Sequence, residues 1–78
     1  MSRASAYRAL IVGIEPDGRD ARGNHRWRIV YRTALDGDER SARTRGFLVT
    51  EVGSLAPGER ANLIRDGRGS IIAIDKTT

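Results

Sequence analysis

The sequence predicts an all-β protein, a small barrel of about five strands. Nine glycines separate short runs that are either apolar or alternating, which is typical of strands joined by turns. The length of 78 residues fits one small domain over residues 1–78, with a thin hydrophobic core. The last run, residues 70–75 (SIIAID), is almost wholly apolar and predicts a closing strand.

The first strand is expected over residues 7–15 (YRALIVGIE), which are rich in branched aliphatic side chains. Pro16, Asp17 and Gly18 follow, and each favours a turn for a different backbone reason. We therefore expect this strand to stop at Pro16 and a polar loop to occupy residues 17–24.

The second strand is expected over residues 25–35, where the side chains alternate. Because strand side chains point to opposite faces with a period of two, one face is predicted to be apolar and the other basic, with Val30 among the arginines. The apolar set is Trp27, Ile29, Tyr31 and Leu35, and the basic set is Arg26, Arg28 and Arg32.

The dipeptide Asp36-Gly37 is a strong hairpin signal, so a return strand is expected over residues 39–52. Gly46 interrupts this strand. A bulge at that position would shift the inward-facing positions from Ala42 and Thr44 to Phe47 and Val49.

The stretch over residues 54–67 supports two interpretations. In one, residues 57–66 form a helix with Pro57 in its first turn and Gly67 at its end, which gives an α+β fold with a three-stranded sheet. In the other, residues 60–65 form a strand between turns at Pro57 and Gly67. The core expected for the barrel is Leu10, Val12, Ile14, Trp27, Ile29, Tyr31, Phe47, Val49, Leu63, Ile72 and Ile74.

Several short motifs bear on these alternatives: Tyr-Arg-Ala-Leu-Ile-Val, Glu-Pro-Asp-Gly, Leu-Ala-Pro-Gly-Glu-Arg and Ile-Ala-Ile-Asp. In this order they resemble the small bacterial β-barrel domains of the DUF3592-like group, over residues 7–75. The resemblance implies a strand over residues 60–65 and a five-stranded barrel of the OB-like or SH3-like kind. The family has no established activity, so it implies no site. Its members often sit beside transmembrane segments and usually have a fuller Asp-Pro turn than residues 66–69 provide.

A second set of motifs, Trp-Arg-Ile-Val-Tyr-Arg, Asp-Gly and Arg-Thr-Arg-Gly-Phe-Leu-Val-Thr, is similar to the arm-type DNA-binding domains of tyrosine integrases. That resemblance implies a three-stranded sheet that reads DNA and is followed by a helix. Here Gly53, Pro57 and Gly58 stand where that helix would begin.

The residues that carry chemistry argue against an enzyme. The chain has no cysteine and one histidine, His25, which we expect at the start of a strand. No serine lies on a nucleophile turn, no cluster has metal-ligand spacing, and no glycine-rich loop opens a helix to hold a phosphate. We therefore expect neither catalysis nor a cofactor.

The excess positive charge lies in one segment. Residues 22–45 carry seven arginines and three acidic residues, whereas the rest of the chain has seven basic and seven acidic groups. This segment is either an ordinary solvated face or a surface for an anionic partner, nucleic acid or an acidic protein. The candidate contacts are Arg22, Arg26, Arg28, Arg32, Arg40, Arg43 and Arg45.

Two functions follow from these observations. The first is a non-catalytic binding or assembly module, which could form a homo-oligomer through a strand edge. The alternative is a nucleic-acid-binding domain that uses the basic hairpin face over residues 22–45. No apolar run is long enough to span a membrane or form a signal-peptide core, so a soluble, cytoplasmic location is expected.

Overall fold

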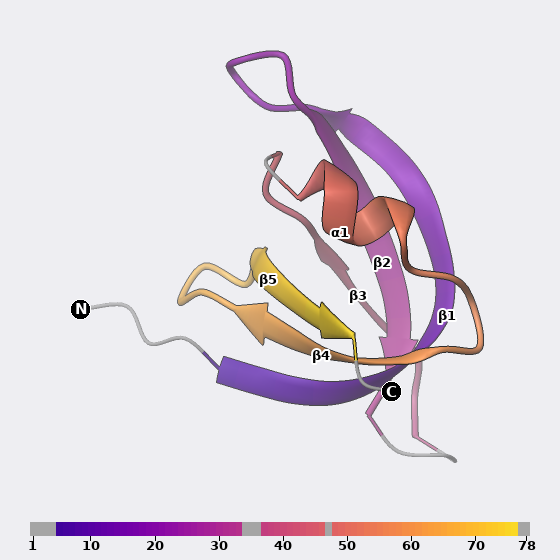
Figure 1. The fold of residues 1–78 in the computed structure, drawn as a ribbon. Helices are drawn as coiled ribbons and strands as arrows, with labels where there is room; N and C mark the ends of the chain where they lie inside the picture. Colours follow the sequence, from indigo (N-terminus) through magenta and orange to yellow (C-terminus); the bar gives the residue numbers. More distant parts are fainter. Residues whose placement is uncertain (1–4, 34–36, 47, 77–78) are drawn as a thin grey trace.

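A computed structural model describes residues 5–33, 37–46 and 48–76 of the chain. Five strands form one antiparallel sheet in the order β3-β2-β1-β4-β5, and one short helix precedes β4 (Figure 1). The strands are β1 (Ser5–Arg19), β2 (His25–Arg32), β3 (Arg40–Arg43), β4 (Arg60–Arg65) and β5 (Ile71–Lys76), and the helix is α1 (Val49–Gly53). The all-β fold class is thus confirmed.

Strand β1 organises the sheet because it pairs with two neighbours along its length. Its first part, from Ser5 to Leu10, pairs with β4, and the part from Leu10 to Arg19 pairs with β2. The strand bends strongly between the two partners (Figure 1). The expected stop at Pro16 is wrong, because Pro16 pairs with Trp27 in β2. The β1–β4 ladder has ended by then, so the missing N–H of this proline interrupts no ladder on that side.

The inward face of β1 differs from the expected one. Ile11 pairs with Tyr31 and Gly13 with Val30, so Val12 is an extra residue in a bulge. Ala9 and Ile11 are therefore buried and Leu10 only partly so, while Val12 is 37 % exposed. The expected core positions Leu10 and Val12 are wrong. Ile14 lies beyond the bulge and packs against the core as expected.

A similar irregularity changes β5. Ile64 pairs with Ala73 and Arg65 with Ile71, so Ile72 is the unpaired residue. Ile71 is fully buried and Ile72 only partly buried, which corrects the expected core position of Ile72. Ile74 packs against the core and Leu63 is fully buried, as the alternating pattern predicts.

The expected return strand over residues 39–52 is much shorter, because β3 ends at Arg43. Ala42 and Thr44 are buried, as expected, but α1 then occupies residues 49–53. Three buried side chains, Leu48, Val52 and Leu55, have the spacing of one helix face. The expected positions Phe47 and the side chain of Val49 lie outside the described residues.

The prediction of a helix over residues 57–66 is wrong, because residues 60–65 form β4. Gly58 has a φ of 90°, a left-handed conformation that suits glycine in a turn. The Gly58 N–H donates to the Ile11 carbonyl, and the Ile11 N–H donates to the Glu59 carbonyl. Backbone pairing with β1 thus begins just before β4, and the strand interpretation of this segment is confirmed.

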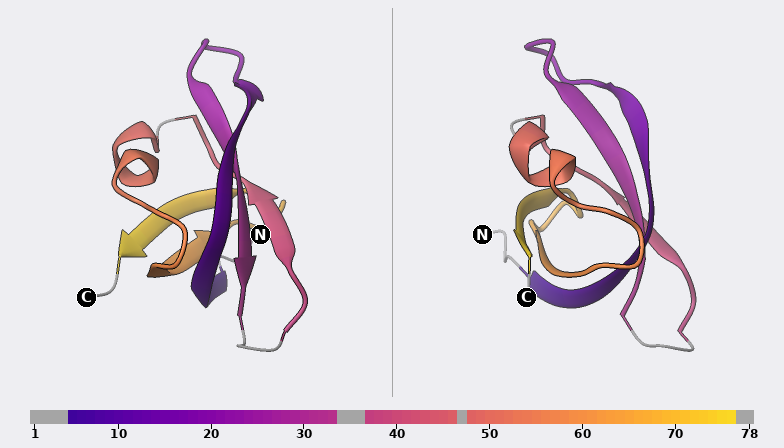
Figure 2. Two further views of the ribbon diagram at one scale, coloured as in Figure 1. Left: turned by 90° about the vertical axis from the view of Figure 1, so that its right-hand side faces the viewer. Right: turned by 45° about the vertical axis from the view of Figure 1, so that its right-hand side comes forward.

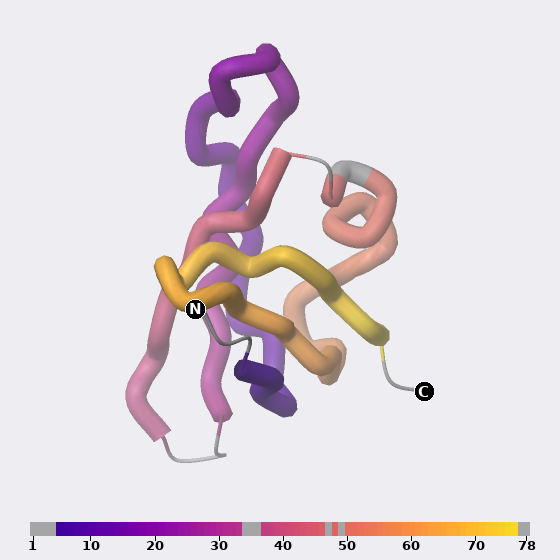
Figure 3. Tube along the Cα trace, turned by 90° about the vertical axis from the view of Figure 1, so that its left-hand side faces the viewer, coloured from indigo at the N-terminus to yellow at the C-terminus, as the bar shows by residue number. Residues whose placement is uncertain are grey.

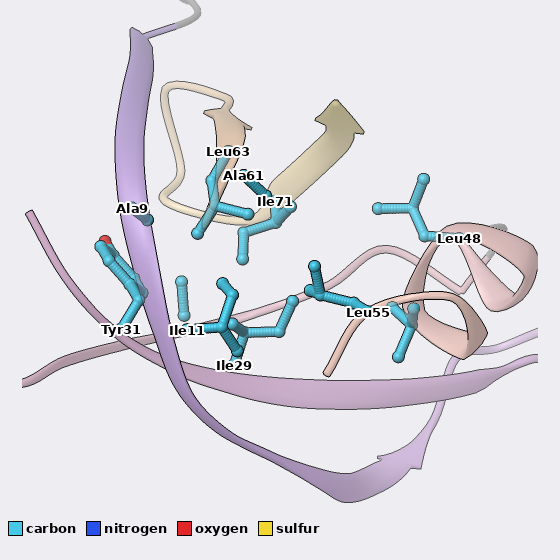
Figure 4. Packing of buried hydrophobic residues seen from close by; sticks show 11 residues of the cluster. Ala9, Ile11, Ile29, Tyr31, Leu48, Leu55, Ala61, Leu63 and Ile71 are labelled. Carbon is cyan, nitrogen blue, oxygen red and sulfur yellow. The ribbon is translucent and has the colours of Figure 1, made fainter. Parts of the chain in front are cut away.

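The core lies between the curved sheet and α1. Ile29 and Tyr31 are fully buried as expected, and Trp27 packs against the core cluster while keeping partial exposure. Figure 4 shows side chains from the strands and from the α1 region converging in this core. The buried apolar side chains are Ala9, Ile11, Ile29, Tyr31, Ala42, Leu48, Val52, Leu55, Ala61, Leu63 and Ile71.

Among the described residues, the two outer strands, β3 and β5, share no ladder, so the sheet is not closed. One isolated parallel bridge joins Thr44, directly after β3, to Ile71 at the start of β5. Figures 2 and 3 show the start of β5 crossing the end of β3 at this point. In the described part of the chain, no helix is long and apolar enough to cross a membrane.

Candidate anion-binding groove

The seven arginines of the basic segment do not form one continuous surface. Arg28 and Arg43 are opposite each other on β2 and β3, and both bind the carboxylate of Asp17 from β1. The Arg43 Nε–Asp17 Oδ2 distance is 2.9 Å, and the Arg28 Nη2–Asp17 Oδ2 distance is 3.2 Å. The hydrogen bond from Arg43 is the main cause of a lowered pKa for Asp17. One carboxylate thus offsets part of the charge of two arginines.

Two further arginines lie toward the β2–β3 turn. The Arg32 side chain donates to Glu39 at 3.0 Å across the hairpin, a cross-strand pair that reduces its field. Arg40 is exposed and lies opposite Tyr31, at the end of β3 far from Thr44. Neither residue lines the groove that contains the remaining three arginines of the segment.

The other three arginines line one open groove of about 570 Å³. They are Arg22 from the β1–β2 loop, Arg26 from β2 and Arg45 from the segment after β3. Arg68 from the β4–β5 loop joins them. The four arginines share this groove with one acidic residue, Asp20, so its lining is strongly basic; the remaining lining residues are Asn24, Gly46 and Ser70.

Arg26 and Arg45 are held in place by hydrogen bonds to neighbouring strands and loops. Arg26 Nε donates to the Thr44 carbonyl at 2.8 Å, and Thr44 itself is fully buried. Arg45 Nη2 donates to Asp66 Oδ2 at 2.9 Å, and the Arg45 N–H donates to the Ile71 carbonyl. The bond from Arg45 is the main cause of a lowered pKa for Asp66. Both guanidinium groups are therefore oriented before any ligand arrives.

The β1–β2 loop packs onto the segment after β3 through Gly46. A Cβ at Gly46 would collide with the Asp20 carboxylate and would stand 2.7 Å from Asn24 Cβ. The Asn24 backbone N–H is the main cause of a lowered pKa for Asp20, and the charge of Arg22 adds to the effect. Gly46 thus allows the loop that carries Arg22 to approach the end of β3 closely.

The groove differs from the expected site in two ways. It contains Arg22, Arg26 and Arg45 but excludes four of the arginines expected there, and it adds Arg68, which the charge distribution did not indicate. The signal for Arg68 is local: residues 20–24 (DARGN) and 66–70 (DGRGS) share the pattern Asp-x-Arg-Gly. No described residue that lines the groove is aromatic.

Histidine and metal chemistry give no further site in the described chain. His25 begins β2, as expected, and its ring centroid lies 6.1 Å from that of Trp27. Within residues 5–33, 37–46 and 48–76, no group of three histidine or acidic side chains could hold a metal ion. No protein-family model matches this chain, and no curated protein or solved structure matches it either. The function must therefore be inferred from the groove itself.

Proposed function

We propose that this chain is a non-catalytic, OB-like binding module that holds a nucleic-acid strand in the groove between the β1–β2 and β4–β5 loops. The observation that carries the proposal is the gathering of four arginines from four separate segments in one groove. Two of them, Arg26 and Arg45, are already oriented by hydrogen bonds. Arginine binds phosphate with a planar set of donors, and neutralising phosphates releases counterions, which favours binding.

The sheet topology supports the OB-like part of the proposal. β1 pairs with both β2 and β4, the helix lies between β3 and β4, and the end of β3 meets the start of β5 in parallel. OB folds are partly open five-stranded barrels that bind oligonucleotides between the loops that join strands 1 to 2 and strands 4 to 5. The groove is flanked by the same two loops here.

Self-association through the edge of β3 has less support than nucleic-acid binding. The outer strand β3 is four residues long and carries exposed arginines at both ends, Arg40 and Arg43. Pairing two copies of this edge antiparallel would bring like charges together, and short charged edges disfavour such pairing. A monomer in light scattering at high protein concentration is the expected result.

The test is fluorescence anisotropy of a labelled single-stranded oligonucleotide over a series of salt concentrations. The wild-type chain is expected to bind, and log K to fall linearly with log salt. Changing Arg22 and Arg68 together to alanine should weaken binding at least about a hundredfold, because each of the two lost charged hydrogen bonds is worth about 1.5–3 kcal/mol. It should also reduce the salt slope by about 1.4, since each phosphate contact on a single strand contributes about 0.7.

The matched control removes the same charge outside the groove. Arg8 on β1 and Arg40 on β3 are both exposed, and neither lines the groove. Changing both to alanine lowers the net charge equally but should leave most of the affinity and the salt slope intact. Equal losses in the two double variants would show that binding depends on total charge rather than on the groove. No binding by the wild type at low salt would overturn the proposal.

A further inference from the structure

The two loops that flank the groove repeat one structural unit. Asp-Ala-Arg-Gly-Asn at residues 20–24 connects β1 to β2, and Asp-Gly-Arg-Gly-Ser at residues 66–70 connects β4 to β5. Each loop begins with an aspartate, has an arginine two residues later, then a glycine and a small polar residue. Figure 1 shows the end of β3 lying between the two loops.

In the first loop, Asp20 organises the backbone. Its Oδ1 accepts the N–H groups of Arg22 and Asn24, both at 2.9 Å. Its own N–H donates to the Asn24 carbonyl at 2.9 Å, and the Gly23 N–H donates to the Asp20 carbonyl at 3.0 Å. Gly23 has a φ of 85°, in the left-handed region that favours glycine.

In the second loop, Asp66 makes the same set of bonds. Its Oδ1 accepts the N–H groups of Arg68 at 2.9 Å and Ser70 at 3.0 Å. Its own N–H donates to the Ser70 carbonyl at 2.9 Å, and the Gly69 N–H donates to the Asp66 carbonyl at 3.0 Å. Gly69 has a φ of 88°. The two loops thus share one backbone conformation, and Arg22 and Arg68 occupy equivalent positions in it.

Both loop arginines differ from the rest of the groove in how their side chains are used. The side chain of Arg26 donates to Thr44, and that of Arg45 donates to Asp66. The side chains of Arg22 and Arg68 form no salt bridge or hydrogen bond within residues 5–33, 37–46 and 48–76. Their contacts in the loops are made by backbone N–H groups. Each loop therefore fixes the backbone of its arginine and leaves the guanidinium group available to a ligand.

We infer that the paired Asp-x-Arg-Gly loops form a two-point clamp for one single strand of nucleic acid, with Arg22 and Arg68 each holding a phosphate of that strand. This inference rests on the proposed function and adds the way in which the groove holds the nucleic-acid strand. Two linked contacts strengthen each other because the second forms within an already bound molecule. A strand long enough to reach both loops gains this advantage, and a shorter one does not.

The shape and lining of the groove also indicate which kind of nucleic acid it binds. The arginines lie in a concavity between two loops rather than on a protruding helix or ribbon, the elements that enter the major groove of a duplex. None of the described lining residues offers an aromatic ring for base stacking, and the Asn24 side-chain amide already donates to Asp20. Contacts to phosphates carry no sequence information. The clamp therefore binds single strands without regard to sequence.

The test is a nuclear magnetic resonance titration of the whole chain with oligothymidylates of increasing length, following the amide signals of Gly23 and Gly69. With the shortest oligomers, the two signals should move weakly and with separate dissociation constants. Above a threshold length, they should move together with one dissociation constant, at least about tenfold tighter. A matched duplex of the same length should bind more weakly than the single strand, and an abasic strand should bind about as well.

The decisive variants are the single changes Arg22→Ala and Arg68→Ala, with Arg40→Ala as the charge-matched control. Each loop variant should lose the length threshold while the glycine of the intact loop still responds, with the affinity of a short oligomer. Arg40→Ala should keep the threshold. Retention of the threshold in both loop variants, or preference for duplex, would overturn the clamp while leaving nucleic-acid binding in place. No shift at either glycine with any strand would overturn the proposed function itself.

Discussion

Gly46 and Asp20 lie in direct contact, although they come from different loops of the chain. A Cβ at position 46 would collide with the Asp20 carboxylate, and it would stand 2.7 Å from Asn24 Cβ. Asp20 cannot swing away freely, because its oxygens accept hydrogen bonds from Arg22 and Asn24. The contact therefore fixes the β1–β2 loop against the segment that carries Arg45.

Gly46→Ala should separate this loop from the end of β3. We expect a loss of about 1–3 kcal/mol in the free energy of unfolding, the usual cost of forcing an extra carbon into a packed site. Urea unfolding measures this loss, and nucleic-acid binding should weaken as well. The control is Gly53→Ala at the end of α1, where a Cβ would meet nothing within 4 Å. Equal destabilisation by the two variants would contradict the packing role of Gly46.

Acid should loosen the β4–β5 loop. The pKa of Asp66 is lowered, first by the Arg45 hydrogen bond and then by backbone N–H groups. The folded chain therefore keeps this carboxylate ionised at a pH where the unfolded chain would protonate it. The resulting stabilisation is present above the usual value of 3.8 and is lost as the pH falls through the lower folded value.

Asp66→Asn tests this pH dependence. The amide keeps an oxygen that can accept the loop N–H groups but has no charge for Arg45. We expect the variant to be less stable than the wild type at neutral pH and the difference to shrink as the pH falls well below about 4. Urea unfolding over a pH series measures the difference, and Asp75→Asn at the exposed end of β5 is the control. A stability difference that stays constant with pH would contradict the ion-pair explanation.

The hydroxyl of Tyr31 connects the core to the β4–β5 loop. Tyr31 is fully buried, and its oxygen accepts a hydrogen bond from Arg65 Nη1 at 3.2 Å. Arg65 Nε also donates to the Gly69 carbonyl at 2.9 Å. Tyr31→Phe should lower the free energy of unfolding by about 1.5–3 kcal/mol, because a hydrogen bond to a charged group is lost while the ring still fills its place.

The matched control for Tyr31→Phe is Tyr7→Phe. The Tyr7 ring lies 5.9 Å from the Arg65 guanidinium carbon, an arrangement that does not need the hydroxyl. Its hydroxyl makes no hydrogen bond in the described part of the chain, so thermal unfolding should show little change. A larger effect at Tyr7 than at Tyr31 would contradict this account.

The sequence predicts the strands of this protein better than the faces of those strands. Alternation correctly placed Ile29 and Tyr31 inside, and the hairpin signal at Asp36-Gly37 correctly predicted the antiparallel β2–β3 pairing. Alternation failed at β1 and β5, because a bulge at Val12 or Ile72 reverses the parity. Gly13 beside Val12 is the kind of residue that marks a bulge within a strand, whereas β5 contains no glycine. The spacing of Leu48, Val52 and Leu55 is typical of a helix face and indicates α1. The prediction of a long strand over residues 39–52 left no place for this helix.

The sequence likewise predicts only part of the candidate binding site. The count of charges in the sequence identified the basic segment. Which of its arginines are available to a ligand depends also on ion pairs with residues that are distant in the sequence. Asp17 is far from Arg43 in the sequence and still binds it, so this loss of available charge could not be foreseen. Arg68 lies outside the basic segment and reaches the groove only because β5 crosses the end of β3 at Thr44.

The bulge in β1 leads to the last prediction, which compares neighbouring residues of similar type. Ile11 is 1 % exposed and packs among the core side chains, whereas Val12 is 37 % exposed. Ile11→Ala should cost about 2–5 kcal/mol, because it removes buried methyl groups and leaves a cavity. Val12→Ala should stay within about 0.5 kcal/mol, as surface changes usually do. Urea unfolding of both variants measures the difference. If the side chains alternated without a bulge from Leu10 to Ile14, Val12→Ala would cost more stability than Ile11→Ala.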